Sequence, residues 1–143
     1  MSLYVIDAGV AVKWFIEEQR SDKAKQLLVN YLRWIDDLIA PDLIIAEAAN
    51  VFWKRAERGD ITPHEAKENL NDLLSLNIPL VSSALLARKA FELAHSHKRS
   101  AYDCLYLALA LEHNCELITD DTRLFNSVGS AFPLLKLVGD LSS

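Results

Sequence analysis

Leu3-Tyr-Val-Ile-Asp7 is a short apolar run near the amino terminus that ends in an acidic residue. A run of this kind, without polar alternation, predicts a buried strand. Glu116-Leu-Ile-Thr119 has the same character and is followed at once by two more acids, Asp120 and Asp121. Similar short segments lie elsewhere in the chain, and the predicted strands are 3–6, 37–40, 79–82, 116–119 and 134–138.

Segments with helical periodicity separate these strands. Apolar residues recur at helical spacing over 24–35, with Ser21 as the expected N-cap. A second helix is expected over 43–58 and should end at Gly59, because glycine favours the position that follows a helix. Thr62-Pro-His-Glu65 combines a capping box with proline at the first helical position, so it predicts the start of another helix. The remaining predicted helices are 83–95, 100–112 and a brief one near Arg123.

Strands that alternate with helices predict parallel βαβ units, and hence a three-layer α/β/α sandwich with a central parallel sheet. The 143 residues fit a single domain over 1–143, since they contain no repeat, low-complexity tract or Gly/Ser linker. No apolar run approaches the roughly 20 residues of a membrane span, and no signal peptide is apparent, so we expect a cytoplasmic protein. Cys104 and Cys115 allow one disulfide, but we expect two free thiols in a reducing compartment.

Three acidic residues stand alone in apolar surroundings. Asp7, Glu47 and Asp103 are each the only charged residue in a stretch of at least eleven. Burying an unpaired carboxylate costs several kcal/mol, so three such residues in one small domain call for a shared explanation. In open α/β sheets ligands bind where the strands end, and Asp7, Asp120 and Asp121 follow two strands that are neighbours in a doubly wound order. Glu47 and Asp103 lie on helices that we expect to close over the same edge.

A bound cation would explain this gathering of carboxylates. Acids that are packed together repel one another and take up protons unless a cation joins them. A site made only of carboxylate oxygens selects a hard ion, Mg²⁺ or Mn²⁺, over zinc or copper. The four histidines offer no metal-ligand spacing, and we assign them no role. The sequence therefore predicts a divalent metal site at the carboxyl edge of the sheet.

Each acid also has a simpler structural explanation. Asp7 suits the turn after a strand, and Glu47 suits the positive end of its helix. Asp103 stands three residues after a serine and would complete a capping box. Asp120 or Asp121 would be an ordinary N-cap for the short helix that follows. These explanations stay open, although all of them would have to apply at one sheet edge.

Four segments, by their order and spacing, resemble the PIN-domain family, and within it the VapC-like ribonucleases that serve as toxins of toxin–antitoxin pairs. The segments are Tyr4–Trp14, Pro41–Val51, Ser100–Ala110 and Leu117–Leu124. The resemblance implies a PIN-like fold and an acidic site made of Asp7, Glu47, Asp103 and Asp121. One position departs from the family pattern: similar proteins carry a small polar side chain two residues after the first Asp, where this chain has Gly9.

The resemblance implies metal-dependent endonucleolytic hydrolysis of RNA phosphodiester bonds. Asp7, Asp103 and Asp121 are expected to bind Mg²⁺, or Mn²⁺ in its place. Glu47 is expected to be a further ligand or a base that orients water. The bound divalent ion is expected to lower the pKa of this water, which then attacks phosphorus. Thr119 would orient a carboxylate or the water, and Asp120 would support the site without being a ligand.

The resemblance also implies partners: an RNA substrate, a cognate antitoxin protein and a second copy of the chain in a homodimer. No association with a membrane is expected. Because the formal net charge is −5, contacts to RNA phosphates need local cations. The candidates are Lys54, Arg55, Arg58 and Arg99, for which solvated helix ends are the plainer explanation. Large aromatic side chains suit partner surfaces as well as a core, and those considered are Trp14, Phe15, Trp34 and Trp53.

Two other functions remain open. A small-molecule phosphohydrolase also gathers acids at a sheet edge, but Asp7-Ala-Gly9 lacks the Asp-x-Asp pattern of the haloacid-dehalogenase type. The other alternative is a catalytically weak or inactive PIN-like module that binds a protein partner, which Gly9 slightly favours. Hydrolysis of a small phosphate ester would support the first alternative, and a failure to bind Mg²⁺ or Mn²⁺ would support the second.

Overall fold

The computed structural model describes residues 1–142, and within them five parallel strands form one sheet in the order β3-β2-β1-β4-β5. The strands are β1 (Leu3–Ile6), β2 (Asp37–Pro41), β3 (Leu80–Val81), β4 (Glu116–Thr119) and β5 (Leu135–Leu137). In the centre of the sheet β1 pairs with both β2 and β4, so that Val5 lies opposite Ile39 on one side and Leu117 on the other. The order of the strands along the chain reverses between β1 and β4, which is the place where open α/β sheets bind ligands.

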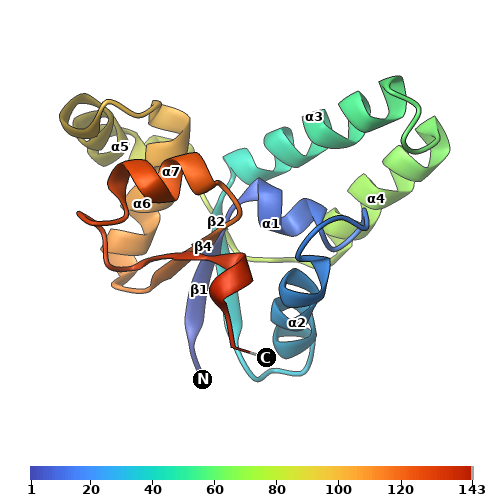
Figure 1. Ribbon diagram of the computed structural model, residues 1–143, viewed down its shortest axis with the longest axis horizontal. Helices are drawn as coiled ribbons and strands as arrows, with labels where there is room; N and C mark the ends of the chain where they lie inside the picture. Colours follow the sequence, from blue (N-terminus) through green and yellow to red (C-terminus); the bar gives the residue numbers. More distant parts are fainter. Residues whose placement is uncertain (143) are drawn as a thin grey trace.

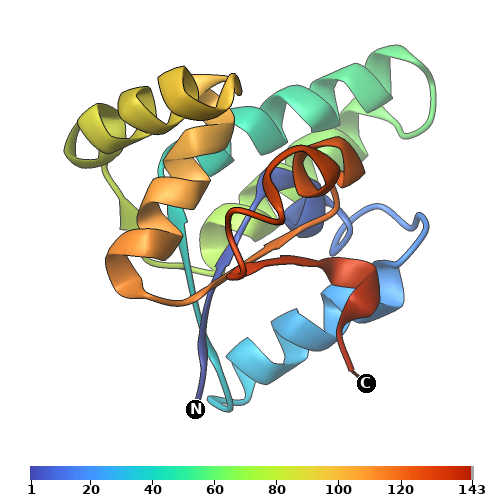
Figure 2. The same ribbon diagram turned by 60° about the vertical axis from the view of Figure 1, so that its left-hand side comes forward.

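Helices cover both faces of the sheet (Figures 1 and 2). On one side lie α1 (Ala8–Val12), α2 (Ser21–Leu32), α3 (Leu43–Glu57) and α4 (Pro63–Ser75). On the other lie α5 (Ser83–His97), α6 (Ala101–His113) and α7 (Thr122–Val128), and a 3-10 turn, η1 (Val138–Asp140), follows β5. The predicted three-layer α/β/α sandwich is confirmed. None of the helices in residues 1–142 is long and apolar enough to cross a membrane.

The core explains why the central segments are so apolar. Val5, Ile6 and Ile118 are completely buried in the middle of the sheet. Helix α6 lies between the sheet and α5, so it needs apolar side chains on nearly every face, and all of its residues from Cys104 to Ala110 are buried. The start of α6 lies at the carboxyl edge of the sheet, where Asp103 and Tyr106 line a pocket.

Most of the predicted helix boundaries are confirmed. Gly59 follows α3 with a φ of +80°, a conformation that glycine adopts without strain. The capping box at the start of α4 is complete, because the backbone N–H of Glu65 and that of Thr62 each bond to the other residue's side chain at 3.0 Å. Cys104 and Cys115 are free thiols, as expected.

Two local features differ from the prediction. Helix α1 was not assigned, because five residues are too few to show a helical period. Ser21 is the first residue of α2 rather than its N-cap, and its hydroxyl accepts a hydrogen bond from the Glu18 N–H at 3.0 Å. The N-cap position belongs to Arg20, whose side chain makes no capping bond.

Candidate active site

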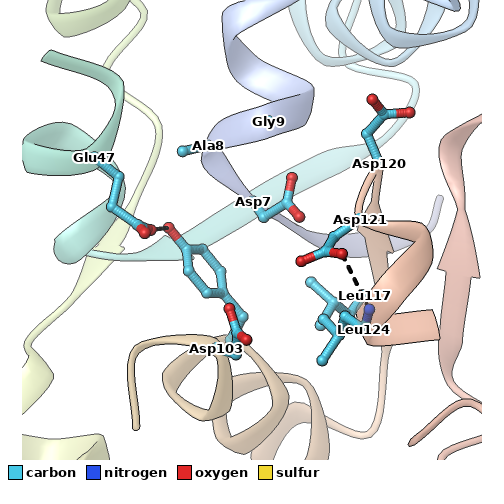
Figure 3. A pocket seen from close by; sticks show the side chains of 10 residues that line it. Asp7, Ala8, Gly9, Glu47, Asp103, Leu117, Asp120, Asp121 and Leu124 are labelled. Atoms are coloured by element: carbon cyan, nitrogen blue, oxygen red, sulfur yellow. Dashed lines mark hydrogen bonds between the residues drawn. The ribbon is translucent and has the colours of Figure 1, made fainter. Parts of the chain in front are cut away.

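A pocket of about 290 Å³ opens at the carboxyl edge of the sheet, between the ends of β1 and β4 (Figure 3). All four acids of the predicted site line it, together with Asp120. The complete lining is Asp7, Ala8, Gly9, Glu47, Asp103, Tyr106, Leu117, Asp120, Asp121 and Leu124. The fold thus brings together carboxylates from the end of β1, the second turn of α3, the start of α6 and the loop after β4.

Asp7 is held by hydrogen bonds to both of its carboxylate oxygens. It caps α1, since its Oδ1 accepts from the backbone N–H of Val10 at 3.0 Å. Its Oδ2 accepts from the hydroxyl of Thr119, a side chain that is completely buried. The pKa of Asp7 is raised to about 6, chiefly by burial and also by the nearby charges of Glu47 and Asp121, while these hydrogen bonds act in the opposite direction.

Thr119 joins two of the acids. Its oxygen donates to Asp7 and accepts from the backbone N–H of Asp121 at 3.0 Å. Asp121 in turn caps α7, because its Oδ1 accepts from the N–H of Leu124 at 3.0 Å. The strand β4 therefore fixes the relative placement of the carboxylates that follow β1 and β4.

Glu47 is bound to a residue that the sequence analysis did not assign to the site. The buried Tyr106 donates its hydroxyl proton to Oε1 of Glu47 at 2.5 Å. Burial and the charge of Asp103 raise the pKa of Glu47, while this hydrogen bond lowers it. Glu47 lies beyond the first turn of α3, so the helix dipole does not account for it. The available signal was spacing, because Tyr106 stands three residues after Asp103 and so shares its helix face.

Asp103 forms half of the predicted capping box. Ser100 caps α6 by accepting from the Asp103 N–H at 3.1 Å. The Asp103 carboxylate does not return a bond to Ser100; its Oδ2 instead pairs with Nη2 of Arg99 at 3.1 Å. The Nε of Arg99 is buried and has no hydrogen-bond partner in the described part of the chain. One of the four candidate RNA-binding cations is thus in contact with the acidic pocket.

Asp120 is engaged elsewhere, and its carboxylate points away from Asp103 and Glu47 (Figure 3). It forms ion pairs with Lys13 at 2.9 Å and with Arg20 at 2.7 Å. Although burial raises the pKa of Asp120, these two partners lower it below its ordinary value. The geometry separates the adjacent acids, because Asp121 faces the pocket while Asp120 anchors the loop.

Lys13 is a buried cation that the sequence analysis passed over. Its side chain is 2% exposed, and its ammonium group has three acceptors: Asp120, Glu18 at 2.9 Å and the backbone oxygen of Gln19 at 2.8 Å. The signal was visible in the sequence, since Lys13 interrupts an apolar run just as the three lone acids do.

The other candidate cations lie at the end of α3 and do not line the pocket. Arg55 is paired with Glu18 at 3.1 Å and with Asp60 at 2.8 Å, and Arg58 is paired with Asp60 at 3.3 Å. Lys54 is exposed. Their contact with RNA stays a prediction.

The four large aromatic side chains divide into two groups. Trp14 is buried and donates its indole N–H to the backbone oxygen of Ala24 at 2.8 Å, and Phe15 packs against the core. Trp34 and Trp53 are mostly exposed, with 84% and 58% of their surface accessible. Only the second pair is available to a partner surface.

The donor set of the pocket fits a hard divalent ion by its chemistry. Within residues 1–142, no three acidic, histidine or cysteine side chains lie close enough together to coordinate one ion in their present conformations. The carboxylates nevertheless repel one another electrostatically. Glu47 and Asp121 raise the pKa of Asp7, and Asp103 raises the pKa of Glu47. A cation in the pocket would relieve this repulsion, and charged donors that are all carboxylates favour Mg²⁺ or Mn²⁺.

The fold and pocket define an α/β protein with an acidic site at the switch point of its sheet. The PIN domain model matches residues 4–130, and the chain belongs to the PIN-domain family. It is 32% identical over 122 residues to Ribonuclease VapC3 of Pyrobaculum aerophilum, a match that covers 84% of this chain and 90% of that protein. The resemblance that the four sequence segments suggested is confirmed.

Two solved structures share the fold. The crystal structure of PAE2754 from Pyrobaculum aerophilum superposes with a TM-score of 0.70 at 22% sequence identity, covering 96% of this chain and 92% of that one. A toxin–antitoxin complex from Klebsiella pneumoniae gives a TM-score of 0.64, also at 22% identity, covering 96% and 98% of the two chains.

Proposed function

We propose that this protein is a Mg²⁺- or Mn²⁺-dependent endoribonuclease, and that it acts as the toxin of a type II toxin–antitoxin pair. One observation carries the proposal: Asp7, Glu47, Asp103 and Asp121 come from four separate elements and line one pocket. A relative named Ribonuclease VapC3 and a structural neighbour titled as a toxin–antitoxin complex support it.

In this proposal Asp7, Asp103 and Asp121 hold the divalent ion. When bound, the ion would neutralise phosphate charge and acidify water. Glu47 would orient the attacking water and take up its proton. A new bond then forms between the water oxygen and phosphorus, the bond to the leaving oxygen breaks, and solvent protonates the leaving oxygen. Thr119 would keep Asp7 in place throughout.

The direct test is cleavage of total RNA by the purified protein with Mg²⁺, with Mn²⁺ and with excess chelator. We expect products only when a divalent ion is present, and none from the Asp7→Asn or Asp103→Asn variants, whose folding circular dichroism would verify. Cleavage that persists in chelator, or in either variant, would overturn the assignment.

The proposal extends to the partners and the location. We propose a cytoplasmic protein that binds RNA, a cognate antitoxin and a second copy of itself. The exposed Trp34 and Trp53 provide apolar surface for protein partners. Light scattering tests the homodimer, and a monomer at high concentration would contradict it.

A catalytically inactive PIN-like module is the second candidate function, and Gly9 is the observation that favours it. A Cβ added to Gly9 would lie 3.5 Å from Oδ1 of Asp7 and 3.9 Å from Cβ of Asp120, which are ordinary contacts. A Cβ therefore fits at this position, so lack of space for it does not explain the glycine. Calorimetry that detects no binding of Mn²⁺ or Mg²⁺ would favour this candidate.

A further inference from the structure

We infer that Tyr106 is a positioning residue of the pocket: its hydroxyl engages Oε1 of Glu47 and leaves Oε2 for the ion or the attacking water. The inference deepens the proposed function and rests on it. It assigns a role to a residue of α6 that acts on an acid of α3, 59 positions away in the chain.

The contact is short, and one of its partners is buried. The two oxygens are 2.5 Å apart, Tyr106 is 4% exposed, and both residues line the pocket. The dashed line at Glu47 in Figure 3 marks this hydrogen bond. Because the tyrosine ring is fixed by the core, its hydroxyl can hold the end of the longer glutamate side chain.

The other acids show why Glu47 needs such a partner. Asp7 and Asp121 have short side chains and are held as N-caps by backbone N–H groups of the helices that they begin. Glu47 has one more rotatable bond and lies inside α3, where the backbone offers it no free donor. Tyr106 is its hydrogen-bond partner among the described residues, and it leaves the second carboxylate oxygen without a bond to the protein.

Tyr106 is suited to be a permanent donor. Its hydroxyl is buried and lies 2.5 Å from a carboxylate oxygen, so the hydroxyl donates and the carboxylate accepts. A hydroxyl has a single proton to donate, and Glu47 receives it. The proton of the tyrosine hydroxyl is therefore directed to Glu47 and is not available as a donor to the substrate.

A double-mutant cycle tests the inference. Tyr106→Phe removes the hydroxyl and keeps the ring, and Glu47→Ala removes the carboxylate that the hydroxyl positions. Calorimetry would measure Mn²⁺ affinity, and steady-state assays would give kcat and KM for a short RNA. We expect Tyr106→Phe to weaken Mn²⁺ binding and lower kcat by about 10-fold or more, with KM for RNA within about twofold. In the Glu47→Ala background, where the hydroxyl has no carboxylate to hold, the same change should cause no further loss of Mn²⁺ affinity.

Tyr102→Phe is the matched control, because Tyr102 lies on the same helix and is 65% exposed. It should leave the Mn²⁺ affinity and kcat unchanged. A Tyr106→Phe protein with wild-type Mn²⁺ affinity and kcat would overturn the inference, as would an equal loss in the presence and absence of Glu47. A wild-type protein that neither binds Mn²⁺ nor cleaves RNA would instead refute the proposed function, and the inference with it.

Nuclear magnetic resonance of the wild-type protein covers the case in which Tyr106→Phe does not fold. The hydroxyl proton of Tyr106 should exchange slowly with solvent, because it is buried and bonded. Its signal should shift when Mg²⁺ is titrated in, since the ion acts on the carboxylate that accepts this proton. A signal that stays unmoved at saturating Mg²⁺ would contradict the inference.

Discussion

At the scale of single residues, the acids of the pocket serve structure and chemistry together. Asp7 and Asp121 are N-caps of α1 and α7, and they also line the pocket. Asp121 uses one carboxylate oxygen for its helix, which leaves the other without a bond to the described protein. Both oxygens of Asp7 accept a hydrogen bond, but a carboxylate has about four lone-pair positions, so each oxygen can still bind an ion. The structural explanation of a lone acid and the functional one are therefore compatible.

Asp7 makes the stability of the metal-free protein depend on pH. Its pKa rises from 3.8 to about 6 on folding, so between these values the folded chain holds a proton that the unfolded chain has released. The stability that Asp7 contributes therefore falls as the pH rises through this window, and the loss is complete above it. Asp7→Asn cannot ionise, so it should be more stable than the wild type at pH 7.5 by about 1–3 kcal/mol.

Thermal unfolding in chelator from pH 4 to pH 7.5 measures this effect. The melting temperature of Asp7→Asn relative to wild type should climb between pH 4 and pH 6.5 and then level off. When Mg²⁺ replaces the chelator, it should raise the melting temperature of the wild type more than that of the variant. A difference in melting temperature between the two proteins that does not change with pH would show that the pKa of Asp7 is not raised by folding.

The neighbouring acids Asp120 and Asp121 should respond differently to the same substitution. Asp121→Asn removes a carboxylate that faces the pocket and should weaken Mn²⁺ binding by about 10-fold or more. Asp120→Asn removes a carboxylate that is occupied by Lys13 and Arg20, so Mn²⁺ affinity should stay within a few-fold of wild type. Calorimetry of both variants would decide, and equal losses would place Asp120 among the ligands.

At the scale of elements, charged side chains join segments that are distant in the chain. Lys13, just after α1, binds the loop that precedes α2 and the loop that carries Asp120. Glu18 continues this connection to Arg55 at the end of α3. A chain of ion pairs thus fixes three elements around one side of the pocket.

Lys13→Met should destabilise the protein strongly. The methionine fills most of the same space but leaves three acceptors without the buried ammonium group, at a cost of about 3 kcal/mol. Lys25→Met is the matched control, since Lys25 forms an exposed pair with Glu17 and should contribute less than about 1 kcal/mol. Urea denaturation measures both free energies, and similar values for the two variants would contradict the account.

The strands and most helices follow from local patterns, which is why they were predictable. Apolar runs, the glycine after α3 and the capping box of α4 each act within a few residues. Tyr106 and Lys13 were missed because their importance depends on partners that only the fold brings near. The hydroxyl of Tyr106 has no visible purpose until α3 places Glu47 beside it, and Lys13 appears as an ordinary lysine until Asp120 is in place.

At the scale of the whole molecule, the negative net charge and the proposed RNA substrate are reconciled by where the charges lie. The net charge is −5, and the acids of the pocket contribute to it without being partners of RNA. An ion in the pocket would offset their charge, and phosphates beyond the cleavage site would need exposed cations. Arg55 is paired with two acids, whereas Lys54 is exposed, so Lys54 is the better placed of the two to contact an RNA phosphate.

Salt titrations of RNA binding should separate these two cations. If Lys54 contacts a phosphate, Lys54→Ala should reduce the slope of log affinity against log salt by about 0.7. Arg55→Ala should leave this slope close to that of the wild type, because its guanidinium is held by Glu18 and Asp60. Unchanged slopes for both variants would make the end of α3 a solvated surface with no part in binding.

The central claim is that three carboxylates from separate parts of the chain bind a divalent ion at the carboxyl edge of the sheet, with Glu47 beside them. A crystal soaked in Mn²⁺ and measured at the manganese absorption edge tests it most directly. The account predicts an anomalous peak in the pocket, about 2.2 Å from carboxylate oxygens of Asp7, Asp103 and Asp121. A fully soaked crystal whose pocket holds no peak, or whose manganese lies away from these three residues, would contradict it.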